Sequence, residues 1–115
     1  MNIEERLLGV AHGVAMGRLG HDMTYRLGAA AYRNDDVLVV AFNGAQSYPT
    51  WQHHAEARLC RKLTPCPVVA VVRVLSNGHW AMARPCDSCQ TCMRRRGVQK
   101  VVYSIQPGEY GALWL

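Results

Sequence analysis

The sequence predicts an α/β fold, a three-layer α/β/α sandwich around one mixed sheet. Segments with helical spacing of apolar residues alternate along the chain with segments typical of strands. The most apolar run lies near the middle of the chain, as expected for a strand that helices cover on both faces. The chain has 115 residues, half of them hydrophobic, so we expect one compact domain spanning residues 1–115.

The predicted elements are, in chain order, a helix over 3–19, strands over 25–32 and 37–42, a helix over 53–62, strands over 68–75 and 79–83, a helix over 86–97 and a strand over 101–105. Asn2 and Glu5 have the spacing of a capping box, which marks the start of the first helix. Asn34-Asp35 is typical of a turn, and it predicts a hairpin of the first two strands. Two prolines within residues 64–67 end the second helix.

A turn sequence in the second half of the chain predicts a second hairpin. Residues 76–78, Ser-Asn-Gly, separate the central strand from a short return strand. We therefore expect a protruding hairpin that carries Asn77, His79 and Trp80 near its tip. It would gate a pocket or contact nucleic acid, or else form a dimer contact or a plain loop. The tail 109–115 has no clear pattern.

Two short motifs carry the chemistry of the chain. The first reads His54-Ala55-Glu56, and after residues 57–84 the second reads Pro85-Cys-Asp-Ser-Cys89. One imidazole and two thiolates form a three-ligand zinc site, in which a catalytic zinc leaves the fourth position to water. A structural zinc would take a fourth protein ligand, for which Cys92 is the candidate. The arrangement H-x-E…P-C-x-x-C is typical of zinc-dependent nucleobase deaminases.

On these motifs the chain resembles the cytidine/deoxycytidylate deaminase superfamily, and the segment 85–103 resembles its deoxycytidylate branch most. The resemblance implies that His54, Cys86 and Cys89 hold Zn²⁺ at the N-termini of two neighbouring helices. It also implies that Glu56 is the catalytic acid/base, which moves protons without being a metal ligand. The expected reaction is the hydrolytic conversion of cytosine to uracil, on the same three-layer architecture that the strand and helix pattern predicts.

The resemblance also suggests which residues contact the substrate. We assign this role to Asn43, because the family carries an Asn-Gly at the end of the corresponding strand; the alternative is a simple turn. Trp51 lies just before the metal ligand and would stack on a base, or else be an ordinary core or lid residue. We also assign substrate contacts to Ala55, between the ligand and the acid, and to Tyr103, at the end of the last predicted strand.

The leading prediction for the substrate is a small molecule, a free cytosine nucleoside or nucleotide such as deoxycytidine or dCMP. The alternative is a nucleic-acid editor of single-stranded DNA or RNA; less favoured are an adenine or guanine deaminase and a non-catalytic zinc protein. The net charge of +5 permits contact with phosphates without requiring it. The run 94–96, three arginines, is weak support, because cations in the last turn of a helix also complement its dipole.

Composition indicates the cellular compartment in which we expect the protein. No apolar run approaches the roughly 18 residues of a transmembrane helix, so we expect no membrane association. Five cysteines, an odd number, favour reduced thiols and metal binding over a disulfide framework. The first residues do not resemble a secretory signal, which together with the reduced cysteines predicts a cytoplasmic protein. The resemblance implies a homo-oligomer.

Overall fold

The computed structural model describes residues 2–17, 26–33, 35–43, 54–63 and 65–115. Its elements are, in chain order, α1 (Ile3–Met16), β1 (Arg26–Tyr32), β2 (Leu38–Phe42), α2 (Ala55–Cys60), β3 (Val68–Val74), β4 (Trp80–Ala81), α3 (Asp87–Arg95), β5 (Lys100–Gln106) and β6 (Glu109–Trp114). The predicted order of helices and strands is confirmed. The tail, which has no clear sequence pattern, forms β6.

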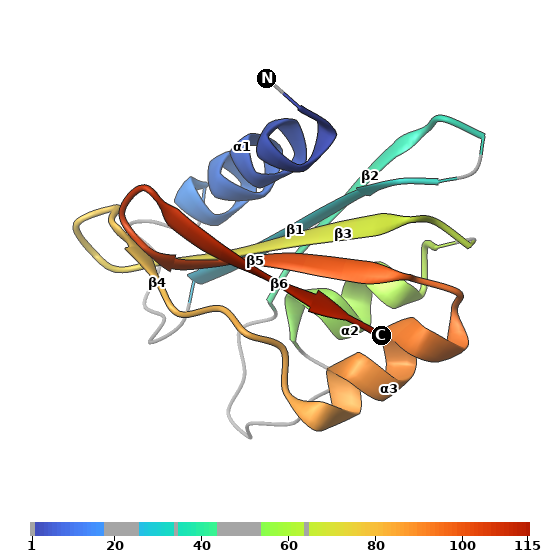
Figure 1. Cartoon of the computed structure of the whole chain (residues 1–115). Helices are drawn as coiled ribbons and strands as arrows, with labels where there is room; N and C mark the ends of the chain where they lie inside the picture. The colour runs from blue at the N-terminus through green and yellow to red at the C-terminus, as the bar shows by residue number, and fades with distance from the viewer. Residues whose placement is uncertain (1, 18–25, 34, 44–53, 64) are drawn as a thin grey trace.

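The strands form one mixed sheet in the order β2-β1-β3-β5-β6, and the short β4 pairs with β3. β3 and β5 are parallel, and the remaining pairs are antiparallel. α1 lies against one face of the sheet, and α2 and α3 lie against the other (Figure 1). The predicted three-layer α/β/α sandwich around a mixed sheet is therefore confirmed.

Each face of the sheet has its own apolar core. The core beneath α1 consists of Leu7, Leu8, Ala11, Ala15, Ala30, Ala70, Val72, Val74 and Val102. In β3 these residues alternate with Val69 and Val71, which belong to the core beneath α2 and α3. A central strand that is buried on both faces needs apolar residues at every position, which explains the apolar run in the sequence.

α1 approaches the sheet most closely at Gly28 of β1. A Cβ atom at this position would lie 2.2 Å from the backbone oxygen of Ala11 and 2.7 Å from the backbone nitrogen of Ala15. Both atoms belong to the helix backbone, so no side-chain rotation relieves the overlap. Gly28 therefore sets how closely the helix layer packs on the sheet. Gly13, by contrast, has no neighbour within 4 Å of its Cβ position and makes no close packing contact.

The helices are shorter than the sequence predicts. Asn2 caps α1 as expected, since its side chain accepts a hydrogen bond from the Glu5 backbone N–H (2.8 Å). α1 ends at Met16, and residues 18–19 of the predicted helix lie outside the described residues. α2 begins only at Ala55, because His54 has an extended backbone and is its N-cap. Among the described helices, none is long and apolar enough to cross a membrane.

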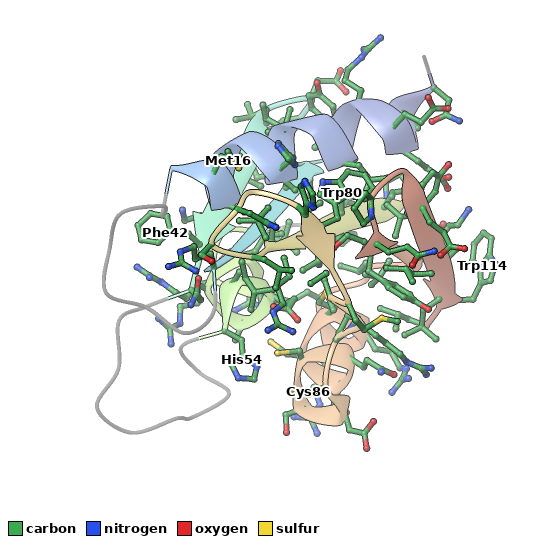
Figure 2. The ribbon with its side chains drawn as sticks, turned by 90° about the vertical axis from the view of Figure 1, so that its left-hand side faces the viewer. Met16, Phe42, His54, Trp80, Cys86 and Trp114 are labelled. Carbon is green, nitrogen blue, oxygen red and sulfur yellow. The ribbon has the colours of Figure 1, made fainter. Side chains whose placement is uncertain are left out.

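The predicted hairpin exists, with a return strand of two residues in place of the predicted 79–83. The backbone N–H of Leu75 donates to the His79 carbonyl (2.9 Å), which closes the turn. Trp80 directly follows the turn and pairs with Val74, so it lies near the tip as predicted. Its indole Nε1 donates to Nδ1 of His12 (2.6 Å), so the hairpin packs on α1 through Trp80 (Figure 2). Gly78 of the turn faces the Met16 side chain. An indole held in this way is not presented to a ligand.

Candidate active site

The two sequence motifs converge at the N-termini of α2 and α3. His54 is the N-cap of α2, Cys86 is the N-cap of α3, and Cys89 lies in the first turn of α3. His54 and Cys86 lie side by side below the sheet (Figure 2). The three potential ligands of the two motifs therefore meet at the start of two helices on one side of the sheet.

The three donor atoms have the spacing of a tetrahedral zinc site. Nδ1 of His54 lies 3.6 Å from Sγ of Cys86 and 3.5 Å from Sγ of Cys89. The three atoms all lie within 4.8 Å of one another. Bond lengths of about 2.0–2.1 Å for Zn–N and about 2.3 Å for Zn–S place tetrahedral N and S ligands about 3.6 Å apart. The donor set therefore fits zinc, and Cys92, the candidate fourth ligand, is not part of this group among the described residues.

The Cys89 thiol keeps its proton as long as no cation lies next to it. Its side chain is fully buried, and burial raises the pKa of the thiol well above its ordinary value. The neighbouring carboxylate of Glu56 and the thiol of Cys86 raise this pKa further. A buried thiol in such surroundings ionises only when a positive charge lies next to it, and a bound metal ion supplies that charge.

Glu56 is a buried carboxyl group at the start of α2. Only 4% of its surface is exposed, and its Oε1 has no hydrogen-bond partner within the described part of the chain. Burial raises the pKa of Glu56 from 4.5 to about 7, against the opposing effect of a backbone hydrogen bond. A carboxyl group with a pKa near neutrality both accepts and donates a proton at physiological pH. This is the property that an acid/base residue at this position needs.

Asn43 and Ala55 lie at the ends of their elements. Asn43 directly follows β2 and is buried, and its Oδ1 accepts a hydrogen bond from the Leu27 backbone N–H (2.9 Å). Its backbone N–H donates to the Leu27 carbonyl (3.3 Å), so the residue continues the pairing of β1 with β2. Ala55 is fully buried at the first position of α2. The substrate-binding role of both residues stays a prediction.

The other two predicted substrate contacts have different outcomes. Tyr103 lies on β5, on the same sheet face as α2 and α3. Its ring lies over Gly111 of β6, since a Cβ atom on that glycine would be 2.9 Å from the Tyr103 hydroxyl oxygen. This contact directs the hydroxyl toward the β6 edge of the sheet, and a role in substrate binding stays a prediction. Trp51 lies outside the described residues.

Ser104 and Gln90 bind the backbone of residues 81–85, the segment that leads into Cys86. The sequence did not predict this role. The Ser104 hydroxyl donates to the Ala81 carbonyl (2.7 Å), and the Ser104 carbonyl accepts from the Ala83 backbone N–H (2.9 Å). The Gln90 amide donates to the Pro85 carbonyl (2.9 Å). Both are positioning residues for the metal ligands. No sequence signal identifies them, because each contact depends on how β4 and α3 lie relative to β5.

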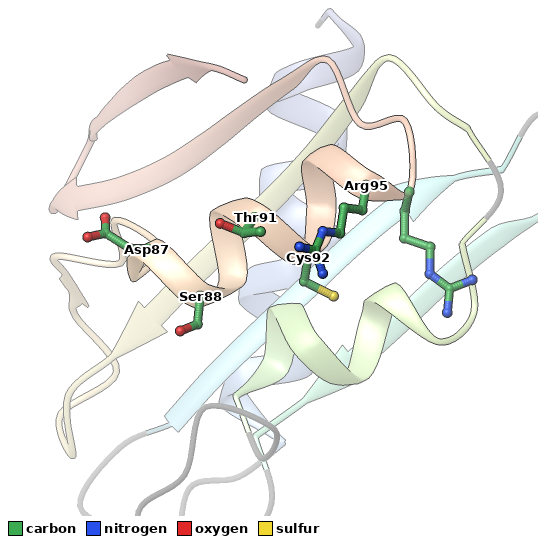
Figure 3. A pocket seen from close by; sticks show the side chains of 6 residues that line it. Asp87, Ser88, Thr91, Cys92 and Arg95 are labelled. Carbon is green, nitrogen blue, oxygen red and sulfur yellow. The ribbon is translucent and has the colours of Figure 1, made fainter.

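A hollow of about 400 Å³ runs along the outer face of α3 (Figure 3). It is lined by Asp87, Ser88, Thr91, Cys92, Arg95 and Arg96. Cys92 points toward α2 and packs against the core that contains Cys60 (Figure 3). The hollow contains neither His54 nor Glu56, and Asp87 offsets part of its positive charge. It is therefore separate from the metal-ligand group.

Comparisons with known proteins identify the fold. No known family profile matches the chain, and no curated protein sequence matches it. Among solved structures, a cytidine deaminase from Burkholderia pseudomallei aligns with a TM-score of 0.70 and 18% identity, over 99% of this chain and 93% of that one. The chain has the cytidine deaminase fold. Cytidine deaminases from Mycobacterium tuberculosis (TM-score 0.61, 18% identity, 93% of this chain and 90% of that one) and Mycobacterium leprae (0.63, 16%, 97% and 94%) align as well.

These neighbours confirm the predicted architecture. All three are cytidine deaminases, so the preference for the deoxycytidylate branch finds no specific support among them. Their low sequence identity to this chain means that the likeness concerns the fold. The chemistry of the chain therefore has to be argued from its own residues.

Proposed function

We propose that this protein is a zinc-dependent hydrolase that deaminates cytosine to uracil in a free nucleoside or nucleotide. One observation carries the proposal: donor atoms spaced for tetrahedral zinc lie beside a buried glutamate whose pKa is near neutrality. The cytidine deaminase fold of the chain supports the same conclusion. Deoxycytidine and dCMP are the substrates that we favour, in a cytoplasmic homo-oligomer.

His54, Cys86 and Cys89 would hold the zinc, which supplies a Lewis acid that makes water nucleophilic at neutral pH. Glu56 takes one proton from the attacking water and gives it to the ring nitrogen of cytosine. It then transfers the second proton to the departing amino group, so that water and cytosine become uracil and ammonia. Burial suits Glu56 to this role, because a pKa of about 7 makes both proton transfers accessible.

Asn43 and Ala55 are the residues that we expect to orient the substrate. The buried Asn43 side chain is fixed by its bond to Leu27, so its amide presents a defined direction to a sugar or base. Ala55 lies between the ligand and the acid, where a small side chain leaves the base room beside Glu56. Tyr103 and Trp51 remain candidates for the pocket wall.

The test is a turnover assay of the zinc-loaded protein with cytosine, cytidine, deoxycytidine, CMP and dCMP, read by mass of the uracil product. Glu56→Gln should lower the rate by about 10²–10⁴-fold with zinc content unchanged. The matched control is Glu109→Gln, which removes an exposed carboxylate on β6 and should keep full activity. If no cytosine compound is converted while zinc is bound stoichiometrically, the proposal is wrong.

A further inference from the structure

α2 and β2 together form a second feature of the surface, a positively charged hollow beside the candidate active site. It has a volume of about 180 Å³ and is lined by Ala41, Phe42, Arg58, Arg61 and Lys62. Arg58 lies in the last turn of α2, Arg61 is the C-cap of this helix and Lys62 follows it. Within the described part of the chain, no acidic residue lines the hollow. We call Phe42, Arg58, Arg61 and Lys62 the α2–β2 tract.

Two of the cations are fixed by contacts with β2. Nη1 of Arg58 donates to the Phe42 carbonyl (3.1 Å), and its guanidinium carbon lies 4.8 Å from the centre of the Phe42 ring. Nζ of Lys62 donates to the Val40 carbonyl (2.6 Å). A guanidinium group has five N–H donors and an ammonium group has three, so these contacts leave donors for a ligand.

Protection of an edge strand accounts for part of this arrangement. β2 is the edge of the sheet, and cations that bind its carbonyls prevent pairing with another chain. That explanation covers Arg58 and Lys62, but it gives no role to Arg61. Arg61 is exposed, and it places a third positive charge on the same hollow. Three cations without a lining carboxylate therefore favour an anion as the ligand.

The tract begins at the candidate active site. The Arg58 backbone N–H donates to the His54 carbonyl (3.0 Å), so Arg58 lies one helical turn, about 5.4 Å along the axis, after the metal ligand. On the other side, Phe42 directly precedes Asn43, the predicted substrate contact. A ligand whose base lies beside Glu56 would therefore have its flanking phosphates near these cations.

We propose that the α2–β2 tract binds the phosphodiester backbone of single-stranded nucleic acid next to the target cytosine. Cations with an adjacent exposed aromatic ring are typical of surfaces that bind single strands, where phosphates pair with the cations and bases stack. A single strand is required, because a cytosine in a duplex does not reach a buried acid/base residue. This proposal rests on the proposed function, and it extends the substrate from a free nucleotide to a polymer.

The first measurement is fluorescence anisotropy of a short, labelled oligothymidylate with the zinc-loaded protein over a range of salt concentrations. The probe has no cytosine, so binding is read independently of turnover. Arg61→Gln, alone and with Arg58→Gln, should weaken binding, and each should lower the slope of log Kd against log salt by about one per cation. The matched control is Arg94→Gln, which removes one exposed arginine from the end of α3. Circular dichroism of each variant verifies its folding.

The proposal stands if the tract variants bind more weakly and have a smaller slope of log Kd against log salt, and if the control variant changes neither quantity. If Arg61→Gln and Arg94→Gln weaken binding equally, the oligonucleotide is attracted by the net charge of the protein, and the proposal is overturned. Competition by dCMP as strong as that by an oligonucleotide of equal phosphate concentration would also overturn it, in favour of a site for one phosphate. If the wild type binds the oligonucleotide and converts no cytosine compound, the proposed function fails while the binding tract remains.

Discussion

Glu56→Gln is the substitution whose effect on stability follows most directly from the structure. The glutamine keeps the size of the side chain and removes its charge. In the metal-free protein, burial raises the pKa of Glu56 from its ordinary value of 4.5 to about 7. Ionisation of this carboxyl group is therefore less favourable in the folded protein than in the unfolded chain, and the difference destabilises the fold at high pH.

The size and the sign of this effect follow from the two pKa values. The interval from 4.5 to about 7, at about 1.4 kcal/mol per pH unit, corresponds to about 3 kcal/mol. The stability that the neutral carboxyl contributes is fully present below pH 4.5 and is lost as the pH rises through about 7. Glutamine stays neutral throughout. Glu56→Gln should therefore match the wild type near pH 4 and exceed its free energy of unfolding by about 3 kcal/mol near pH 8.

The assay is urea unfolding of both proteins in the presence of a chelator, at several values between about pH 4 and pH 8. All other titrating groups are shared, so the difference between the two curves isolates Glu56. Glu109→Gln is the control, because it makes the same chemical change at an exposed position. A Glu56→Gln difference that is constant with pH, or that grows toward low pH, would refute the reasoning.

Two further substitutions test the packing that positions the site. Gly28→Ala places a Cβ atom against the α1 backbone and should lower the free energy of unfolding by about 1–3 kcal/mol, measured by urea unfolding. Gly13→Ala, with open space around its Cβ position, should instead gain up to about 1 kcal/mol, and equal effects of the two would contradict the packing argument. Ser104→Ala leaves the Arg73 backbone N–H and the Ala81 carbonyl without their partner and should cost about 1–3 kcal/mol. Ser88→Ala, at an exposed position of α3, is its control, and similar stabilities of these two variants would argue against the role of Ser104.

Much of the fold was predictable, because its signals are local. The spacing of apolar residues identified α1, and the apolar run identified β3 as the central strand. The tail was not predictable, since β6 has no pattern of its own. It becomes a strand by pairing with β5 across the turn at Gly108, whose φ of 77° favours glycine.

For the site, the sequence by itself determined the chemistry of the groups. It contains an imidazole, two thiols and a carboxyl group in two motifs, and each motif orders its own residues at the start of a helix. Only the tertiary structure decided that His54 meets Cys86 and Cys89, because α2 and α3 come together on one face of the sheet. It also decided the pKa of Glu56, since burial by surrounding elements, and not the residue type, sets the cost of its charge.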